Sequence, residues 1–355
     1  IRGKGLTDAE TLSRIDHPLA KALAAYRVLE TIHGTFLEPL KGYEYKGKIH
    51  CDFMQVKSWE SKNDSSDTDT YSGTETGRLA ANHPNLGNIA KPRELTLPNK
   101  KIVVNIRKVF ELSEEERKDF QLLLFDWSQI EMRLLAEESG DQTLIDAFLN
   151  KKDMHTETAI KVFGKNKSQM DLKDYFGENA AATDEEKRDW IWDKKYRFKA
   201  KAVNFGLVYG LGVTRFSKEH NMSRDEGEAF FEKYFGEFPG VKKFTEGMIK
   251  SAEKLGYVKT RFGRRRPLPE RDSYKAPNTR IQSSAADMNK IAMKRVADIL
   301  KGKKSVMINN VHDEITIKHF RKEIEVPKLV VQQMEDWPGF KVPITASVSV
   351  AWPSW

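Results

Sequence analysis

Apolar side chains recur at helical spacing in several parts of the chain. Residues 17–38 carry a series of them three or four positions apart, which predicts an amphipathic helix. The members of this series are Leu19, Leu23, Tyr26, Leu29, Ile32 and Phe36. Residues 128–140, 193–210 and 282–301 have the same kind of periodicity, and Gly140 marks the expected end of the first of these helices.

Two segments have the pattern of β-strands. Residues 121–126, QLLLFD, form a short apolar run that ends at an aspartate and leads into the helix predicted at 128–140. Residues 305–319, SVMINNVHDEITIKH, alternate apolar and polar positions around a tight centre, which predicts a β-hairpin. Residues 58–76 and 164–192 are polar without a clean period, so we expect a loop and an insertion there.

Composition narrows the classes of function. The 355 residues include 60 Lys and Arg against 52 Asp and Glu, and the net charge of +8 suggests a polyanionic partner. Cys51 is the single cysteine, which excludes an internal disulfide and a cysteine zinc cluster. No apolar run approaches the roughly 20 residues of a membrane span, so we expect a cytoplasmic protein without membrane contact. Neither G-x-x-x-x-G-K-[ST] nor G-x-G-x-x-G occurs, so a P-loop or dinucleotide-binding fold has no support.

Ionisable residues fall where the predicted strands end. Asp126 closes the apolar run, and His312 and Asp313 lie at the centre of the predicted hairpin. Two aspartates that converge on one sheet edge repel each other unless cations lie between them. A pair of Mg²⁺ ions about 3.5–4 Å apart is a common apparatus for phosphoryl transfer. The alternative is that Asp126 caps a helix that starts at Ser128, and that His312 and Asp313 form an ordinary turn.

Residues 196–210, YRFKAKAVNFGLVYG, place two cations and two aromatic rings at four-residue intervals. These are Arg197, Lys201, Phe205 and Tyr209. On a helix they share one face over about 18 Å, so the cations could bind a triphosphate while the rings stack on a sugar and a base. Asn204 and Gly206 flank Phe205 and are expected to let a ligand come close. The alternative is an amphipathic helix with its rings in the core and its cations in water.

In this order, three segments resemble the polymerase motifs of the family A DNA polymerases (DNA polymerase I type). They are DWSQIEMR at 126–133, R-x3-K-x3-F-x3-YG at 197–210 and VHDE at 311–314. TGRLAANHPNLGNI, KKDMHTETA, GYVKTRFGRRRPLPE and NTRIQSSAADMNK resemble other segments of the family, so the resemblance covers residues 15–163 and 193–355. It implies a template-directed DNA polymerase whose partners are primer-template DNA and deoxynucleoside triphosphates.

The resemblance also implies roles for individual residues. Asp126 and Asp313 would bind metal, together with the backbone carbonyl of Trp127, and Glu314 would assist them. The implied cofactor is Mg²⁺, two ions per site, with Mn²⁺ able to substitute. Glu131 would be a steric gate that leaves no room for a ribose 2′-hydroxyl.

Further residues would hold the substrates. Those implied for the incoming nucleotide, besides Glu131, are His155, Arg197, Lys201, Phe205 and Tyr209. Those implied for the DNA are Arg78, Asn85, Asn88, Asn278, Gln282 and His312. Minor-groove acceptors occur in every Watson–Crick pair, so contacts to them would report pair geometry without reading sequence. The basic cluster of Arg261, Arg264, Arg265 and Arg266 would add phosphate contacts, unless it is a solvated loop.

The implied fold is α+β, a right-hand polymerase with an antiparallel palm sheet and mostly helical fingers. We expect thumb-base helices at 1–42, with the thumb largely absent. The palm is expected at 43–133 and 273–355, and the fingers at 134–272 with an insertion near 164–192. We also expect a monomeric core without a proofreading domain in this chain.

The sequence departs from the family pattern at particular positions. Trp127 stands where tyrosine is usual, Tyr274 where an arginine often lies, and Gly87 where a glutamine is common, which would remove one polar contact to DNA. Two other functions stay open. One is a single-subunit RNA polymerase, against which Glu131 argues, and the other is a catalytically weak DNA-binding fragment that needs a missing N-terminal part.

Overall fold

The computed structural model describes residues 12, 15–56, 73–89, 92–97, 100–163, 197–208, 212–220 and 222–351. The chain divides into two compact units. Unit 1 comprises residues 1–126, 296–329 and 348–355, and unit 2 comprises residues 127–295 and 330–347. The expected insertion at 164–192 and most of the expected loop at 58–76 lie outside the described residues.

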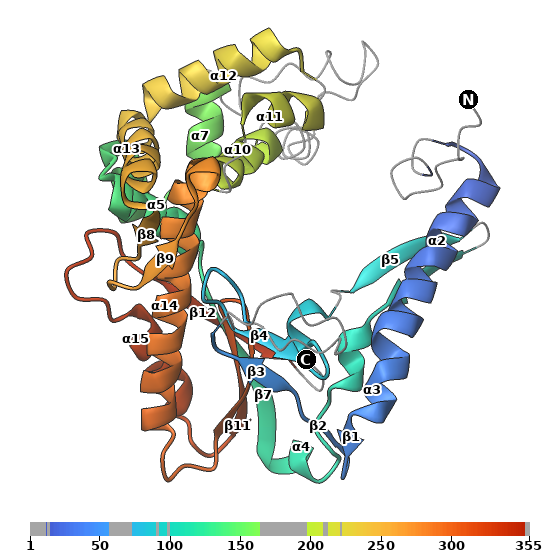
Figure 1. Ribbon diagram of the computed structural model, residues 1–355. Helices are drawn as coiled ribbons and strands as arrows, with labels where there is room; N and C mark the ends of the chain where they lie inside the picture. Colours follow the sequence, from blue (N-terminus) through green and yellow to red (C-terminus); the bar gives the residue numbers. More distant parts are fainter. Residues whose placement is uncertain are drawn as a thin grey trace, which may run out of the picture. The chain divides into compact units, whose positions relative to one another are not determined.

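Most of a four-stranded sheet lies in unit 1, with the strand order β10-β11-β7-β12 (Figure 1). Its strands are β10 (Val306–Val311), β11 (Glu314–Phe320), β7 (Phe120–Trp127) and β12 (Ala346–Ala351). Strand β11 runs antiparallel to both neighbours, and its register places Glu314 opposite Asp126. Leu122, Leu123 and Phe125 of β7 are buried, so the apolar run in the sequence is the interior of a strand.

Shorter elements surround one apolar core in unit 1. Helix α2 (Pro18–Ile32) continues as a π-helix (His33–Leu37) and then as α3 (Glu38–Gly42). The short antiparallel strand pairs are β1 (Glu44–Tyr45) with β2 (Lys48–Ile49), β3 (Asp52–Met54) with β4 (Ala80–Asn82), and β5 (Arg93–Leu97) with β6 (Lys100–Val104). The other elements are η2 (Leu86–Asn88), η3 (Ile106–Val109), α4 (Glu116–Asp119) and the start of α15 (Val326–Glu335). Ile32, Leu86, Ile106, Leu122 and Val311 meet in the core.

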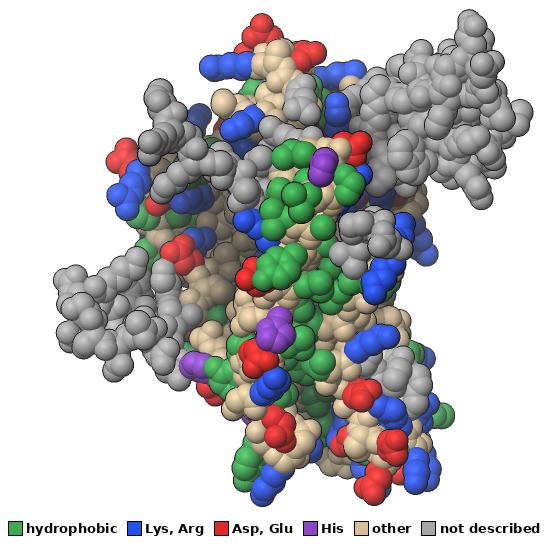
Figure 2. Space-filling view, turned by 90° about the vertical axis from the view of Figure 1, so that its right-hand side faces the viewer, with side chains coloured by type: hydrophobic (Ala, Val, Ile, Leu, Met, Phe, Trp, Pro, Cys, Tyr) green, Lys and Arg blue, Asp and Glu red, His purple; other side chains and the backbone are tan. Residues whose placement is uncertain are grey.

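The apolar face expected on residues 17–38 is only partly buried. Ile32 lies in the core of unit 1, whereas Leu19 is 71% exposed and Tyr26 is 59% exposed. Figure 2 shows apolar side chains at the surface of one face of the molecule, among charged ones. The predicted helix is confirmed, but its spacing does not tell which apolar positions reach the core.

Unit 2 is mostly helical. Its helices are α5 (Ile130–Ser139), α6 (Gln142–Leu149), α7 (Met154–Phe163), α10 (Phe198–Val208), α11 (Val213–Glu219), α12 (Arg224–Glu237), α13 (Pro239–Leu255) and most of α14 (Ala276–Ile299). The strand pair β8 (Tyr257–Lys259) and β9 (Arg265–Pro267) and the 3-10 helix η6 (Glu270–Lys275) precede α14. Helix α12 begins with a capping box, in which Ser223 and Glu226 each accept the other's backbone N–H.

Gly240 of unit 2 lies where the starts of two helices come into close contact. Asp141 caps α6, because its Oδ1 accepts the N–H of Leu144 at 3.3 Å. Its Oδ2 accepts the N–H of Gly240, at the start of α13, at 2.8 Å. A Cβ atom on Gly240 would lie only 2.7 Å from the Cα of Asp141, so a larger residue would push α13 away from this cap.

The α+β class is confirmed, and several predicted elements are close to their expected bounds. The apolar strand is β7, and the hairpin is β10 and β11 joined at His312 and Asp313. The helix expected from 282 begins earlier, at Ala276. No helix among the described residues is long and apolar enough to cross a membrane. The division into palm, fingers and thumb base remains a prediction.

Candidate functional site

Three residues with carboxylate side chains lie at the same end of the paired strands β7 and β11. Asp126 near the end of β7 lies directly opposite Glu314 at the start of β11, and Asp313 precedes Glu314 in the turn. Residues directly opposite in an antiparallel pair have Cβ atoms about 4.5–5.5 Å apart, and like charges there destabilise the sheet. The cluster therefore favours binding of a cation at this edge.

Two backbone features hold the cluster in place. The turn residue His312 has φ +58°, a left-handed conformation that allows the chain to reverse within two residues. Asn310 is buried, and its Nδ2 donates to the carbonyl oxygen of Glu314 at 2.9 Å. The side chain of Asn310 on β10 thus fixes the turn that carries Asp313.

Helix capping does not account for Asp126. The helix after β7 begins at Ile130, and its N-cap is Gln129, at φ +55° with no side-chain cap. Asp126 is exposed at the sheet edge, three residues before that cap. The alternative that Asp126 caps a helix starting at Ser128 is therefore wrong.

The cluster has the donor set of a magnesium site shared with a substrate. Among the described residues, no three His, Cys, Asp or Glu side chains form a group that could hold a metal ion. Mg²⁺ is commonly bound by one or two carboxylates together with water and substrate phosphates, rather than by a cage of protein ligands. Asp126 and Asp313 fit that mode of binding, and would hold the ion best when a phosphate is present.

Trp127, whose carbonyl is expected to face metal, is anchored by its side chain. It is 3% exposed, and its indole Nε1–H donates to the carbonyl oxygen of Met334 at 3.0 Å. Trp337 donates to the same oxygen at 2.5 Å. A tryptophan at this position, where the family pattern has tyrosine, is thus accommodated with its polar N–H satisfied.

In unit 2, a cation row precedes and enters α10. Arg197 donates from Nε to Oδ2 of Asp153 at 2.7 Å and from Nη2 to Oδ1 at 3.2 Å. Burial raises the pKa of Asp153, but the Arg197 guanidinium and Thr156 outweigh it and lower the pKa to about 2. Lys201, one turn further along α10, is exposed. Arg197 and Lys201 thus lie on the helical segment expected from the sequence. The Phe205 side chain and Tyr209 lie outside the described residues.

His155 on α7 is buried beside α10. Its side chain is 4% exposed, and its Nδ1 lies 3.2 Å from Nδ2 of Asn204. Burial is the main cause that lowers the pKa of His155 to about 4; Arg197 and Lys201 act in the same direction, and Asp153 opposes them. Asn204 itself is fully buried, so the expectation that it leaves space for a ligand is wrong.

Glu131 lies in the first turn of α5 and is 6% exposed, beside the buried Ile130 and Met132.

Asn278 and Gln282 lie one helical turn apart on α14 and so share a face of the helix. Gln282 is buried, and Oδ1 of Asn278 is buried with no hydrogen-bond partner among the described residues.

The other residues implied for DNA lie in unit 1. Asn85 at the N-cap of η2 and Asn88 at its last position are exposed, while Leu86 and Ile89 of the same segment are buried in the core. This segment packs against β10, the strand that leads to His312. Arg78, half-buried, precedes β4. The apolar residues thus anchor a loop that presents its amides to solvent.

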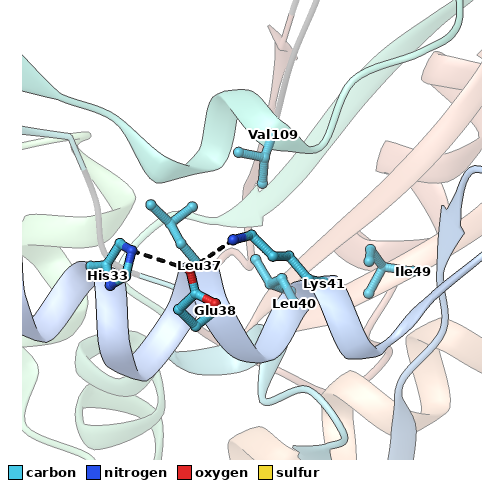
Figure 3. A pocket seen from close by; sticks show the side chains of 7 residues that line it. All are labelled: His33, Leu37, Glu38, Leu40, Lys41, Ile49 and Val109. Atoms are coloured by element: carbon cyan, nitrogen blue, oxygen red, sulfur yellow. Dashed lines mark hydrogen bonds and ion pairs between the residues drawn. The ribbon is translucent and has the colours of Figure 1, made fainter.

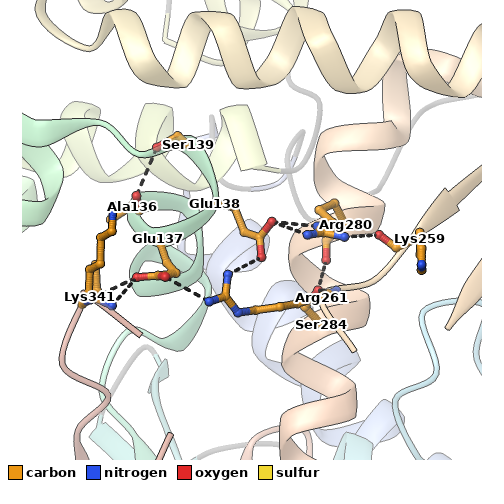
Figure 4. A network of polar contacts seen from close by, with 10 residues as sticks. Ala136, Glu137, Glu138, Ser139, Lys259, Arg261, Arg280, Ser284 and Lys341 are labelled. Atoms are coloured by element: carbon orange, nitrogen blue, oxygen red, sulfur yellow. Dashed lines mark hydrogen bonds and ion pairs between the residues drawn. The ribbon is translucent and has the colours of Figure 1, made fainter. Parts of the chain in front are cut away.

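Most arginines of the basic cluster after β8 have partners within unit 2, and the interpretation of this cluster as a phosphate-binding patch remains a prediction. Arg261 pairs with Glu137 at 3.0 Å and Glu138 at 3.2 Å, and Arg280 of α14 pairs with Glu138 at 2.6 Å (Figure 4). Arg264 pairs with Asp287 at 2.7 Å, and Arg266 donates to Thr279 at 2.8 Å. Arg265 is exposed over the ring of Tyr257. Sequence spacing contains no signal for these pairs, because the partners are far apart in the chain.

A separate cavity of about 370 Å³ lies in unit 1, lined by residues of the π-helix, α3, β2 and η3 (Figure 3). Glu38 on its rim accepts from Lys41 at 2.7 Å and from His33 at 3.2 Å. The remaining lining side chains are Leu37, Leu40, Ile49 and Val109. No residue implied for DNA, nucleotide or metal lines this cavity.

Comparisons with known proteins agree with the motifs. DNA polymerase I of Streptococcus pneumoniae (strain ATCC BAA-255 / R6) is 36% identical over 343 residues, covering 93% of this chain and 34% of that protein. DNA polymerase I of Bacillus subtilis is 34% identical over 366 residues, covering 98% of this chain and 36% of that protein. The chain therefore spans about a third of the length of these curated relatives.

A solved structure is similar over the whole chain. It is the POL domain of Pol1 from M. smegmatis in complex with DNA primer-template and dNTP, with a TM-score of 0.78 and 28% sequence identity. The match covers 100% of this chain and 57% of that one. The sequence model of DNA polymerase family A matches residues 2–355. The chain belongs to DNA polymerase family A.

Proposed function

We propose that this chain adds deoxynucleotides to the 3′ end of a DNA primer in the order set by a template strand. Membership of DNA polymerase family A supports this proposal, as does the similarity to a polymerase domain bound to primer-template and dNTP. We further propose that it acts as a monomeric core, in the cytoplasm with the DNA. The reaction joins the primer 3′-oxygen to the α-phosphorus of the nucleotide and releases pyrophosphate.

The observation that carries the proposal is the position of Asp126 opposite Glu314, with Asp313 beside it in the turn. Asp126, Asp313 and the carbonyl of Trp127 would hold two Mg²⁺ ions, or Mn²⁺ in their place, with the help of Glu314. When bound, the ions lower the pKa of the primer 3′-hydroxyl and stabilise the leaving pyrophosphate. The carboxylates would orient the ions, and the ions would relieve the repulsion between the carboxylates.

The residues of unit 2 bind the nucleotide. Arg197 and Lys201 offset the charge of the triphosphate, and His155 donates a hydrogen bond to it. Glu131 excludes the ribose 2′-hydroxyl, because a buried carboxylate on a rigid helix leaves no space for an added oxygen. Phe205 packs on the sugar and Tyr209 on the nascent base pair.

A further set of residues is proposed to bind the primer-template. Those proposed are Arg78, Asn85, Asn88, Asn278, Gln282 and His312. Arg78, Asn278 and Gln282 contact minor-groove acceptors that all Watson–Crick pairs share, and His312 lies near the primer end. This mode of binding selects correct pair geometry and leaves the enzyme indifferent to sequence.

Primer extension tests the proposal against its two alternatives. The chain is incubated with Mg²⁺, a primer-template of known sequence, and either four deoxynucleotides or four ribonucleotides. Template-encoded extension with deoxynucleotides supports the proposal. Preferred use of ribonucleotides would identify an RNA polymerase, and DNA binding without any extension would leave the weak-fragment alternative.

A further inference from the structure

A buried polar cluster joins three helices of unit 2 behind His155. It consists of His155 and Thr158 on α7, Asn204 on α10 and Tyr234 on α12. Thr158, Asn204 and Tyr234 are fully buried, and His155 nearly so. Water cannot supply missing partners there, so the hydrogen bonds of this cluster have to be satisfied within it.

The hydroxyl of Thr158 sets the direction of the first bond. It donates to the carbonyl oxygen of Met154 at 2.8 Å, a shorter contact than the 3.3 Å to Oδ1 of Asn204. With its hydrogen used in this way, Thr158 accepts from Nδ2 of Asn204 at 3.0 Å. Tyr234 donates its phenolic hydrogen to Oδ1 of the same amide at 3.1 Å. Both contacts orient the amide of Asn204 in the same sense.

This orientation determines which nitrogen of His155 carries the proton. The second hydrogen on Nδ2 of Asn204 is directed at Nδ1 of His155, 3.2 Å away. A ring nitrogen that accepts a hydrogen bond has no proton, so the neutral imidazole carries its proton on Nε2. Burial holds the pKa of His155 near 4, which keeps the ring neutral at physiological pH.

We propose that Asn204 is a positioning residue that holds His155 in its Nε2–H tautomer, so that the ring offers an uncharged donor to the triphosphate of the incoming nucleotide. This inference rests on the proposed function. Asp153, two residues before His155, pairs with Arg197, so the proposed triphosphate ligands lie in one neighbourhood of unit 2. A neutral donor adds a directed hydrogen bond without repelling Arg197 and Lys201.

The tautomer is measured directly by ¹⁵N NMR of the full chain labelled at histidine. The chain has eight histidines, so the signal of His155 is assigned by its loss in His155→Gln. We expect a protonated Nε2 and an unprotonated Nδ1. Asn204→Asp, of nearly the same shape, presents only acceptors and is expected to move the proton to Nδ1. Tyr234→Phe removes one of the two contacts that orient the amide and is expected to raise the population of the other tautomer.

Nucleotide affinity is then measured on complexes of the chain with primer-template whose primer ends in a dideoxynucleotide, so that no chemistry is needed. Loss of a hydrogen bond to a charged group predicts that Asn204→Asp weakens dNTP binding about 10- to 100-fold. In a His155→Gln background the same substitution is expected to add little. A full effect in that background would mean that the new charge, not the tautomer, weakens binding, and would overturn the inference.

Failure of the inference can be distinguished from failure of the proposed function. A wild-type His155 with its proton on Nδ1, or a tautomer unchanged in both Asn204→Asp and Tyr234→Phe, overturns the role of Asn204 even if primers are extended. Absence of extension and of dNTP binding in the wild type would refute the proposed function, and with it the triphosphate as ligand of His155. If Asn204→Asp does not fold, Tyr234→Phe carries the same test.

Discussion

Glu138→Gln is expected to destabilise unit 2 by about 2–3 kcal/mol. The side chain of Glu138 is 6% exposed and accepts from two arginines, Arg261 at 3.2 Å and Arg280 at 2.6 Å (Figure 4). These arginines come from the strand pair after α13 and from α14, so one carboxylate joins three parts of the unit. A glutamine keeps the shape but loses the charge and replaces one acceptor by a donor that faces a guanidinium.

The size of this loss in stability depends on which partners the two arginines keep in the variant. Removing one partner of a buried ion pair typically costs about 3–5 kcal/mol, because the other charge stays buried and unpaired. Here Arg261 is 28% exposed and keeps Glu137 at 3.0 Å. Arg280 is 21% exposed and keeps the carbonyl oxygen of Lys259. These remaining contacts with water and protein reduce the expected cost to about 2–3 kcal/mol.

Calorimetric melting measures this cost, with a matched control on the surface of the same unit. Each kcal/mol lowers the Tm of a unit of this size by about 2–4 °C, so Glu138→Gln is expected to lower it by about 4–12 °C. Glu228→Gln makes the same chemical change in a pair with Arg224, whose side chains are 52% and 75% exposed. It is expected to cost less than about 0.5 kcal/mol. A Tm for Glu138→Gln within about 2 °C of that control would refute the reasoning.

Three further outcomes are expected. Glu131→Ala should raise the use of ribonucleotides relative to deoxynucleotides by about tenfold or more in single-nucleotide extension, and an unchanged ratio would place the gate elsewhere. Because the pKa of His155 is about 4 in the folded state against 6.5 in the unfolded state, stability should fall as pH drops from 6.5 to 4. As pH falls across this range, the free energy of unfolding should decrease by about 3 kcal/mol more in the wild type than in His155→Gln, and equal slopes in denaturation experiments would contradict the burial argument. Trp127→Phe should lower the free energy of unfolding in urea by about 1 kcal/mol, because the hydrogen bond to Met334 is lost. No change would mean that water or Trp337 compensates fully for that bond.

Local patterns predicted the elements that carry the carboxylates. Alternation around residues 312 and 313 predicts a hairpin. A short apolar run that ends in an aspartate predicts a buried strand with a polar end. Both follow from residues close together in the chain, and both are confirmed in β7, β10 and β11. That Asp126 lies opposite Glu314 is a matter of strand register, which the alternation alone could not give.

Contacts between distant segments could not be predicted in the same way. Arg261 and Glu137 are separated by 124 positions, so the basic cluster could not be recognised from spacing as internal ion pairs. Asn204 was equally open to misinterpretation, because a small polar residue on a helix with a ligand-binding pattern can face either the ligand or the core. Its burial depends on Thr158 and Tyr234, which reach it from two other helices.

The central claim is that Asp126 and Asp313 act together in phosphoryl transfer, and primer extension by Asp126→Asn and Asp313→Asn tests it most directly. With Mg²⁺ and all four deoxynucleotides, we expect each variant to extend a primer at least about 10²–10³-fold more slowly than the wild type. DNA affinity, measured on the same primer-template, should stay within about threefold, because other residues are proposed to bind the DNA. Extension by either variant within about tenfold of the wild-type rate, at unchanged DNA affinity, would contradict the account.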